Sequence, residues 1–283
     1  MSPRGTPELS ASGRSGAVAA PGPFRALSLD LWFTTVYHDG DFDDRWEAAR
    51  REVLGRLLRR DGRALSPEEI DGALAGARER ISAAGGDLVA TDPAELLGAV
   101  AGRLEESVVG DPAAAVEAFS SAGLHELPPE MNPEAARVVE ELGRRGVPSV
   151  LVTNSGRRAS SWAAFLRGAG RPTFRAIVSS ADLGVRKPDP KIFREAARCL
   201  GVPVERILHV GDRWELDVEG AIAAGCGAVL YRGLWHRYPE GLYPSVPDPL
   251  PGTSAVRVID RLDELLEPSL WEPAAVGGRA VTG

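Results

Sequence analysis

The 283-residue sequence lacks the features that mark several protein classes. Its two cysteines, Cys199 and Cys226, form no CxxC pair, which argues against a disulfide framework or a zinc site and favours a reducing, cytoplasmic compartment. No apolar run reaches the roughly 18 residues that a membrane-spanning helix needs. The chain has 33 basic and 40 acidic residues, a net charge of −7, and no long basic block. We therefore expect neither nucleic acid nor a membrane as a partner.

Lysine is scarce as well. Lys187 and Lys191 are the two lysines of the chain, and the other 33 − 2 = 31 basic residues are arginines. A G+C-rich genome produces such a bias without any functional cause. It nevertheless restricts the chemistry, because a reaction that needs an amine has two candidate side chains.

The two ends of the sequence have little that would fold by itself. Residues 1–23 are rich in Gly, Ser, Pro and Ala and lack the apolar segment of a signal peptide, so we expect a disordered leader. Residues 267–283 are expected to form a flexible tail, in which Trp271 is the one residue suited to pack back onto the protein.

Five short apolar runs, bounded by Gly, Pro or polar residues, predict buried strands. They lie at 24–31, 149–154, 175–180, 207–212 and 227–231. Helical patterns separate the last four runs, and strands that alternate with helices predict an α/β fold with a parallel sheet. Ligand sites in such sheets lie beyond the carboxyl ends of the strands.

The segment at 41–130 interrupts this alternation. It contains four helical patterns, each of which opens with Asp or Ser near an N-cap position and closes at Gly. We expect a small helical bundle inserted after the first strand, where it would cover the strand ends as a cap. The core would then comprise 24–40 and 131–266.

Polar residues follow the expected strands at the same edge of the sheet. They are Asp30 and Thr34, Thr153 and Asn154, Lys187, and Asp212 and Asp217. Two neighbouring carboxylates are unfavourable unless a cation joins them, and Mg²⁺ prefers such oxygen ligands. A threonine hydroxyl and an ammonium group can hold the other oxygens of a transferring phosphoryl group. The spacing of Asp217 from Asp212 suits it to orient Lys187 or a metal-bound water.

Four segments together resemble the haloacid dehalogenase-like hydrolases over about 24–265. They are "LSLDLWFTT", "SVLVTNSG", "GVRKPDPKIF" and "ILHVGDRWELDVEGAIAAG". The resemblance implies a Rossmann-like parallel core sheet with strand order 5-4-1-2-3 and a helical cap after the first strand. It also implies a magnesium-dependent hydrolase of a small phosphorylated molecule.

The same resemblance implies roles for individual residues. Asp30 would be the nucleophile that forms an aspartyl-enzyme intermediate, with Thr153 and Lys187 as the other catalytic, phosphate-binding residues. Asp30, Asp212 and the main-chain carbonyl of Trp32 would hold the Mg²⁺, and we add Asp217 to the predicted metal site on its spacing from Asp212. The predicted substrate-binding residues are Thr34, Asn154 and Trp32.

Trp32 departs from the family pattern. Phosphatases of the family have Asp there, which protonates the leaving oxygen and then deprotonates the attacking water. The indole N–H is a donor that does not titrate in the accessible range. Loss of acid–base assistance costs roughly 10²–10⁴-fold in rate. Relatives that instead use a lysine from the cap are excluded, because 41–130 contains no lysine.

Three readings of Trp32 remain open. The first, which we favour, is a phosphoryl hydrolase or transferase with altered acid–base chemistry. It would act on leaving groups of low pKa or recruit His38, Asp39 or Asp41 as a base, with Trp32 as an apolar wall for an aromatic or prenyl-like substrate. The second is a catalytically impaired protein that binds a phosphorylated ligand or a partner. The third is a dehalogenase, which needs no acid to release halide.

Two further expectations concern the surroundings of the site. His209 lies in an apolar run and is expected to be a hydrogen-bonded core histidine. The stretch at 233–252 is rich in Pro, Gly and aromatic residues, and we expect an ordered loop beside the site that is suited to a contact between two copies in a homodimer.

Overall fold

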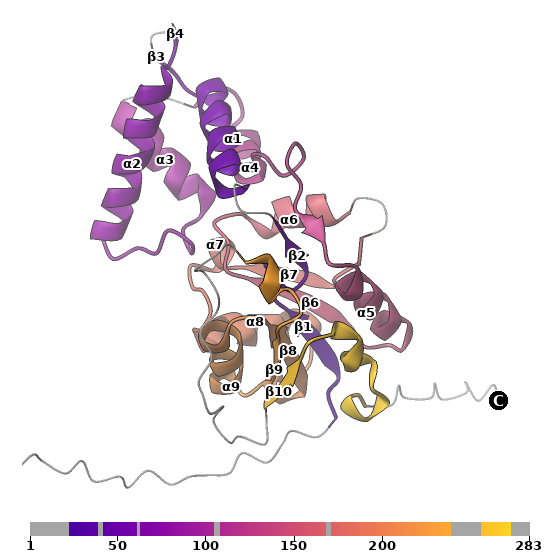
Figure 1. Cartoon of the computed structure of the whole chain (residues 1–283). Helices are drawn as coiled ribbons and strands as arrows, with labels where there is room; N and C mark the ends of the chain where they lie inside the picture. Colours follow the sequence, from indigo (N-terminus) through magenta and orange to yellow (C-terminus); the bar gives the residue numbers. More distant parts are fainter. Residues whose placement is uncertain are drawn as a thin grey trace, which may run out of the picture.

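The central feature of the fold is a parallel sheet of six strands (Figure 1). This computed structural model describes residues 23–38, 42–60, 63–104, 108–167, 171–238 and 256–272. The strand order is β10-β9-β8-β1-β6-β7. The strands are β1 (Ala26–Leu29), β6 (Ser149–Thr153), β7 (Ala176–Ser179), β8 (Ile207–Gly211), β9 (Gly227–Tyr231) and β10 (Val256–Ile259).

The sheet confirms the expected α/β fold and strand order. The five predicted runs are β1, β6, β7, β8 and β9, and their observed order is 5-4-1-2-3. The sequence does not predict β10, which pairs in parallel with β9 at the edge of the sheet. Its sequence, Val-Arg-Val-Ile, is broken by Arg257 and is mostly half-buried, so it lacks the continuous apolar signature of an inner strand.

Helices cover both faces of the sheet. Leu27 and Leu29 of β1 face one apolar cluster with α5 (Pro133–Arg144) and the 3₁₀ turn η4 (Leu262–Leu266). Ala26 faces the other, which contains α8 (Pro190–Leu200) and α9 (Gly220–Ala224). This alternation is the two-residue period of a strand buried on both sides. The remaining elements of the core are β2 (Val36–Tyr37), β5 (Glu130–Met131), α6 (Ala159–Leu166), α7 (Ser180–Leu183), η1 (Val204–Arg206), η2 (Trp214–Glu219), η3 (Trp235–Arg237) and η5 (Pro268–Leu270).

A helical unit, residues 42–121, stands apart from the sheet in Figure 1. Its helices are α1 (Phe42–Leu57), α2 (Pro67–Ala83), α3 (Pro93–Leu104) and α4 (Pro112–Ser121), and they share an apolar core of their own. Ser66 caps α2 in a capping box with Glu69, and Asp111 caps α4. Two-residue strands, β3 (Arg59–Arg60) and β4 (Arg63–Ala64), which the sequence did not predict, form a small hairpin between α1 and α2.

The helical unit contacts the core at segments that follow the carboxyl ends of β6 and β7. Arg158 donates two hydrogen bonds to the carboxylate of Asp92, at 2.6 and 2.9 Å. The hydroxyl of Ser180 donates to the main-chain oxygen of Val89 at 2.7 Å. The unit therefore lies against the sheet edge at which a parallel α/β fold places its ligand site.

The first and last described segments of the chain pack together at the opposite side of the core. Phe24 and Trp271 form an edge-to-face pair with ring centroids 6.5 Å apart, and the Trp271 indole donates to the main-chain oxygen of Leu265 at 2.6 Å. Residues 267–272, the first part of the expected flexible tail, are thus packed against the fold. Residues 1–22 and 273–283 of the predicted leader and tail lie outside the described residues.

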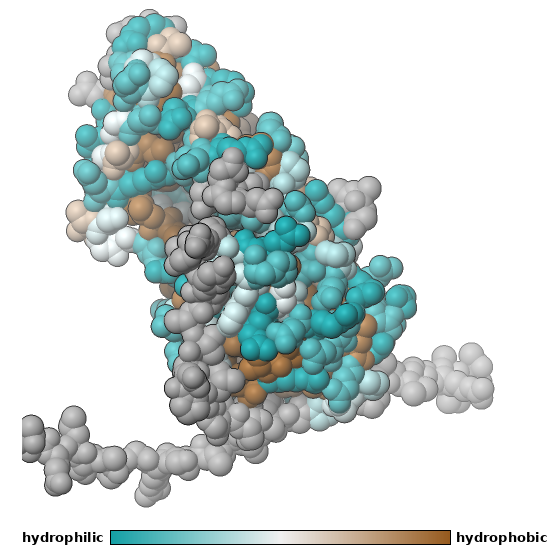
Figure 2. All heavy atoms as spheres, in the orientation of Figure 1, coloured by the Kyte–Doolittle hydropathy of each residue, from teal (hydrophilic) through white to brown (hydrophobic). Residues whose placement is uncertain are grey.

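The visible surface of the described part is mostly hydrophilic, with scattered hydrophobic patches (Figure 2). Within the described ranges, no helix has both the length and the apolar composition needed to cross a membrane.

Candidate functional site

Three carboxylates meet where β1 and β8 end. Asp30 follows β1 directly, Asp212 follows β8 directly, and Asp217 lies in η2, one turn further on. One oxygen from each lies within 4.8 Å of the others. Because β1 and β8 are neighbouring parallel strands, their carboxyl ends bring Asp30 and Asp212 to the same edge of the sheet.

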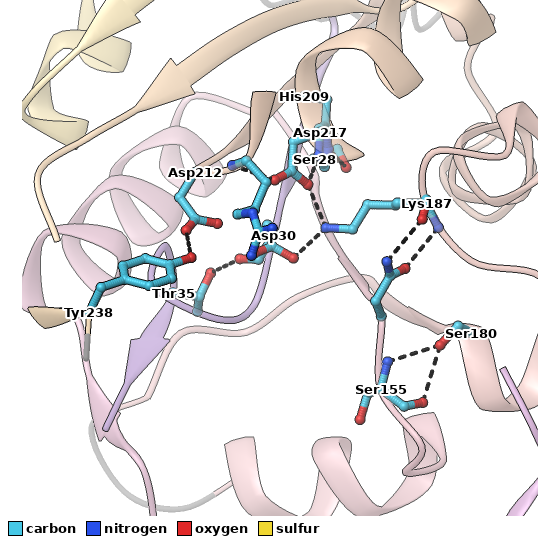
Figure 3. Close-up of polar contacts among 12 residues, drawn as sticks. Ser28, Asp30, Thr35, Ser155, Ser180, Lys187, His209, Asp212, Asp217 and Tyr238 are labelled. Atoms are coloured by element: carbon cyan, nitrogen blue, oxygen red, sulfur yellow. Dashed lines mark hydrogen bonds and ion pairs between the residues drawn. The ribbon is translucent and has the colours of Figure 1, made fainter. Parts of the chain in front are cut away.

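Lys187 joins two of these carboxylates (Figure 3). Its Nζ atom donates to Oδ1 of Asp30 and to Oδ1 of Asp217, the latter at 2.5 Å. Asn154 holds the lysine in place from the end of β6, because its side chain accepts from the Lys187 main-chain N–H at 2.8 Å and donates to the Lys187 oxygen at 3.0 Å. Three of the predicted motifs thus converge on one ammonium group.

Asp217 is fixed from several sides. Its Oδ2 accepts from the main-chain N–H of Arg213 at 2.9 Å, and its Oδ1 lies 3.2 Å from Nε2 of His209. The other ring nitrogen of His209 bonds the hydroxyl of Ser28 at 2.8 Å, so the histidine is the hydrogen-bonded core residue that the sequence predicts. Gly211 makes room for this arrangement, since a Cβ there would lie 2.2 Å from Cγ of Asp217.

The buried charges of the cluster are unbalanced. With all three carboxylates ionised, Asp30, Asp212 and Asp217 against Lys187 give a formal charge of −3 + 1 = −2, and the four side chains are 6%, 1%, 1% and 2% exposed. Burial raises the pKa of Asp30 to about 6, although Lys187 opposes the rise. Burial and the negative charges of Asp30 and Asp217 hold the pKa of Asp212 well above its usual range.

The pKa values of the other groups shift in the directions that keep Asp217 and Lys187 charged and His209 neutral. Burial works to raise the pKa of Asp217, but Lys187 and His209 outweigh it and hold that pKa below its ordinary value. Burial would lower the pKa of Lys187, but Asp217 and Asp30 raise it. Burial lowers the pKa of His209, so the imidazole contributes no positive charge at neutral pH. One divalent cation would neutralise the −2 of the fully ionised cluster and so oppose the raised pKa values of Asp30 and Asp212.

Aromatic residues that the sequence did not assign contact Asp212. The phenol of Tyr238 donates to Oδ2 of Asp212, and the indole of Trp235 donates to the Asp212 main-chain oxygen at 3.2 Å. Tyr238 also stacks on Phe33, with ring centroids 3.9 Å apart. Phe33 has φ of +54°, the left-handed region in which glycine is favoured. Tyr238 and Trp235 belong to the stretch at 233–252 that is expected to lie beside the site, whose residues 239–252 fall outside the described ranges.

Trp32 belongs to an aromatic cluster rather than to the charged one. Its indole packs edge-to-face on Trp46 of α1 at 5.4 Å, on Trp162 of α6 at 5.5 Å and on His38 at 5.3 Å. It therefore lies between the core and the helical unit. Of the predicted alternative bases, His38 is in contact with Trp32, and Asp39 and Asp41 lie outside the described residues.

The predicted threonines are buried near the strand ends. The hydroxyls of Thr153, at the end of β6, and of Thr34 have no hydrogen-bond partner among the described residues. Thr35, which the sequence did not single out, uses its hydroxyl to bond the main-chain oxygen of Asp30 at 2.7 Å. A buried hydroxyl without a partner is unusual, so Thr153 and Thr34 have donors available to a ligand.

Comparison with known proteins decides the family. Residues 41–225 match the hydrolase family described as haloacid dehalogenase-like hydrolases. The chain is a haloacid dehalogenase-like hydrolase. The resemblance to this family is thereby confirmed, and so is the assignment as a hydrolase; the matched residues contain the second, third and fourth motifs.

Individual relatives agree with this placement. The chain is 36% identical over 156 residues to glyceraldehyde 3-phosphate phosphatase from Methanopyrus kandleri, which covers 55% of this chain and 62% of that protein. It is 39% identical over 110 residues to phosphoserine phosphatase from Thermus thermophilus, covering 38% and 43%. The chain thus matches less than two thirds of the length of either enzyme.

A solved structure shows the same fold. The 2-haloacid dehalogenase from Pseudomonas syringae pv. Tomato DC3000 superposes with a TM-score of 0.53 at 20% identity, over 86% of this chain and 97% of that one. At this identity the likeness concerns the fold of the haloacid dehalogenase-like hydrolases alone.

Proposed function

We propose that the protein is a Mg²⁺-dependent phosphatase or phosphotransferase that acts on a small organic phosphate through Asp30. The observation that carries the proposal is the buried cluster of Asp30, Asp212, Asp217 and Lys187. Its formal charge is −2 when all three carboxylates are ionised. Phosphatases among the relatives, for glyceraldehyde 3-phosphate and phosphoserine, support the choice of phosphoryl chemistry.

Asp30 is the nucleophile in this proposal. It is the most exposed of the three carboxylates, at 6%, and it lies at the end of the central strand. One of its oxygens forms a bond to phosphorus while the bond from phosphorus to the leaving oxygen breaks, and the leaving oxygen keeps the electron pair. Water then attacks the aspartyl-phosphate, which releases phosphate and restores Asp30.

The other residues divide the remaining tasks. Asp30, Asp212 and the main-chain carbonyl of Trp32 are suited to hold Mg²⁺, which when bound neutralises charge on the phosphoryl oxygens. Both oxygens of Asp217 are engaged by Lys187, His209 and the Arg213 amide, so we assign Asp217 chiefly to positioning Lys187. Thr153 and Lys187 bind phosphoryl oxygens, and Thr34 and Asn154 support that pocket.

Trp32 sets the class of substrate. The indole supplies no proton to the leaving oxygen, so we propose leaving groups of low pKa, such as aryl or acyl phosphates. Trp46 and Trp162 bury only part of Trp32, which stays half-buried, and we propose that an aryl group packs on the rest of the indole. A dehalogenase is disfavoured, because an anionic haloacid would meet a cluster that already carries excess negative charge.

Phosphate release from a substrate panel tests the proposal. The panel contains 4-nitrophenyl phosphate, acetyl phosphate, glyceraldehyde 3-phosphate and phosphoserine, with MgCl₂ or with EDTA. We expect turnover of the aryl and acyl phosphates that EDTA and Asp30→Asn abolish, whereas Asp260→Asn, which affects an exposed ion pair with Arg232, retains it. No phosphate release from any compound, or release that Asp30→Asn leaves intact, would overturn the proposal.

A further inference from the structure

A buried arginine outside the charged cluster has two unpaired donors. Arg157 lies in the loop between β6 and α6 and is 1% exposed. Its Nη1 atom donates to the main-chain oxygen of Ser120 at 2.6 Å, and its guanidinium lies 4.0 Å from the ring centre of Trp46. Its Nε and Nη2 atoms have no hydrogen-bond partner among the described residues. Buried polar groups are nearly always satisfied, so these donors point to an absent acceptor.

The surroundings of Arg157 are positively charged. Arg50 of α1 lies beside it, with Nη2 4.0 Å from the position that a Cβ of Gly156 would take, and its Nε atom is also buried without a partner. Glu47 accepts from Arg50 at 2.9 Å and from Arg78 at 2.8 Å. Arg50 and Arg78 bond the carboxylate of Glu47, whereas Arg157 feels only its charge, so these three guanidinium groups and one carboxylate sum to 3 − 1 = +2.

The pKa of Arg157 also indicates that its positive charge is not compensated by a neighbouring acid. Burial lowers the pKa of Arg157 well below its usual range, the charge of Arg50 lowers it further, and Glu47 opposes both. An oxyanion beside Arg157 and Arg50 would accept the unpaired hydrogen bonds and neutralise the excess charge. The fork of a guanidinium group fits carboxylate and phosphate oxygens especially well.

The arginines lie close to the proposed reaction centre. Arg157 stacks on Trp46, and Trp46 in turn contacts Trp32, two residues after Asp30. The loop that carries Arg157 also carries Asn154, which bonds the main chain of Lys187. The positive charge of Arg157 therefore lies between the helical unit and the core, and the ring of Trp46 contacts both Arg157 and Trp32.

We propose that Arg157 and Arg50 form a subsite for a second anionic group of the substrate, a carboxylate or phosphate remote from the phosphoryl group that Asp30 attacks. This inference rests on the proposed function, and it narrows the substrate to phosphate esters that carry another oxyanion. A purely structural role for Arg157, as a link between loop and helical unit, predicts no such preference.

Aryl phosphates that differ only in the group opposite the phosphate distinguish a substrate-binding role of Arg157 and Arg50 from a purely structural role. We compare 4-carboxyphenyl phosphate and 1,4-phenylene bisphosphate with the neutral 4-carbamoylphenyl phosphate. We expect a lower KM for at least one anionic compound in the native protein. Arg50→Gln should raise that KM roughly tenfold to hundredfold, the scale of a lost charge-assisted hydrogen bond, and leave kcat and the carbamoyl KM unchanged. Whether the KM is lowered for the carboxylate compound, for the bisphosphate or for both identifies the oxyanion that the subsite prefers.

The control is Arg56→Gln, on the same helix, which removes an exposed ion pair with Glu52 and should change neither KM. Arg157→Lys retains the charge but not the fork, and we expect an intermediate loss. Arg50 is 19% exposed in its side chain, so Arg50→Gln is the variant that tests the subsite if changes at Arg157 prevent folding. Equal KM values for anionic and neutral compounds in the native protein would overturn the subsite.

Binding measurements keep this test independent of turnover. By calorimetry in MgCl₂, 4-(phosphonomethyl)benzoate should bind more tightly than 4-(phosphonomethyl)benzamide, and Arg50→Gln should abolish the difference. If that difference is found while no compound turns over, the subsite stands and the proposed function fails. Equal binding of the benzoate and the benzamide, together with turnover of aryl phosphates, rejects the subsite and leaves the function in place.

Discussion

The Nζ atom of Lys187 lies 2.5 Å from Oδ1 of Asp217, and the two side chains are only 2% and 1% exposed. The same ammonium contacts Asp30, so one cation holds two carboxylates together in the interior. Removing one partner of a buried ion pair leaves the other charge uncompensated, which is far more damaging than the loss of a surface pair.

Lys187→Met is therefore expected to destabilise the protein by about 3–5 kcal/mol and to abolish phosphate release. Urea unfolding and the aryl phosphate assay measure the two effects. Lys191→Met is the matched control, since Lys191 is the other lysine of the chain and is exposed on α8. If the two variants unfold at the same urea concentration, the buried cluster does not depend on Lys187.

The pH dependence of stability follows from the carboxylates. The pKa of Asp30 is raised from 3.8 to about 6, so the folded state holds a proton that the unfolded state releases. Its contribution to stability is fully present below about pH 4 and is lost as pH rises through about 6. Asp212 acts in the same direction. Asp217, with a lowered pKa, contributes above pH 3.8 and loses that contribution as pH falls further.

Mg²⁺ should restore the stability that is lost at higher pH, because Mg²⁺ binds the ionised form of the carboxylates. We expect MgCl₂ to raise the melting temperature more at pH 8 than at pH 5, and Asp212→Asn to remove this difference. Thermal unfolding with and without MgCl₂ at the two pH values measures it. A stabilisation by Mg²⁺ that is as large at pH 5 as at pH 8 would argue against metal binding by Asp30 and Asp212.

Trp32→Asp tests whether the missing acid limits the range of substrates. We expect it to raise the rate on phosphoserine, whose leaving group needs a proton, by roughly 10²–10⁴-fold, and to change acetyl phosphate hydrolysis little. Trp32→Asn is the control, because it removes the same indole packing against Trp46 and Trp162 but supplies no acid. Equal rates for the Asp and Asn variants on phosphoserine would show that acid–base assistance is not what Trp32 withholds.

Gly211→Ala tests the close approach of Asp217. The added methyl group would lie 2.2 Å from Cγ of Asp217, so we expect a loss of about 1–3 kcal/mol in stability together with a loss of activity. Gly143→Ala is the control, since a Cβ there meets nothing within 4 Å on α5. That substitution should stabilise the protein by about 0.5–1 kcal/mol. The argument fails if Gly211→Ala leaves phosphate release unchanged.

The sequence predicts the central sheet well because its signals are local. An inner parallel strand is a short, continuous apolar run, and β6 and β8 are of this kind. The edge strand β10 has no such run. The sequence also predicts that Asp30 and Asp212 lie at one edge of the sheet, because all strands of a parallel sheet end there, and the family resemblance makes their two strands neighbours, as the structure shows.

The partners of these residues were much harder to foresee. Tyr238 follows Asp212 by 26 residues, and Thr35 rather than Thr34 bonds the Asp30 main chain. Asn154 has both polar ends of its side chain bonded to Lys187, 33 residues away. No spacing rule connects such pairs, since loops and the packing of separate elements decide which side chains meet.

By itself, the sequence determined the α/β core and the identity of the charged residues at the strand ends, and its four motifs pointed to a family whose resemblance implied the strand order. Hydrophobic periodicity and the residue that follows each strand are local properties of the chain. Only the tertiary structure decided that Lys187 joins Asp30 to Asp217 and that Trp32 packs between the core and the helical unit. It also decided that Arg157 is buried while two of its nitrogen atoms have no partner among the described residues. Each of these depends on long-range contacts, which arise when distant segments are folded against one another and solvent is excluded between them.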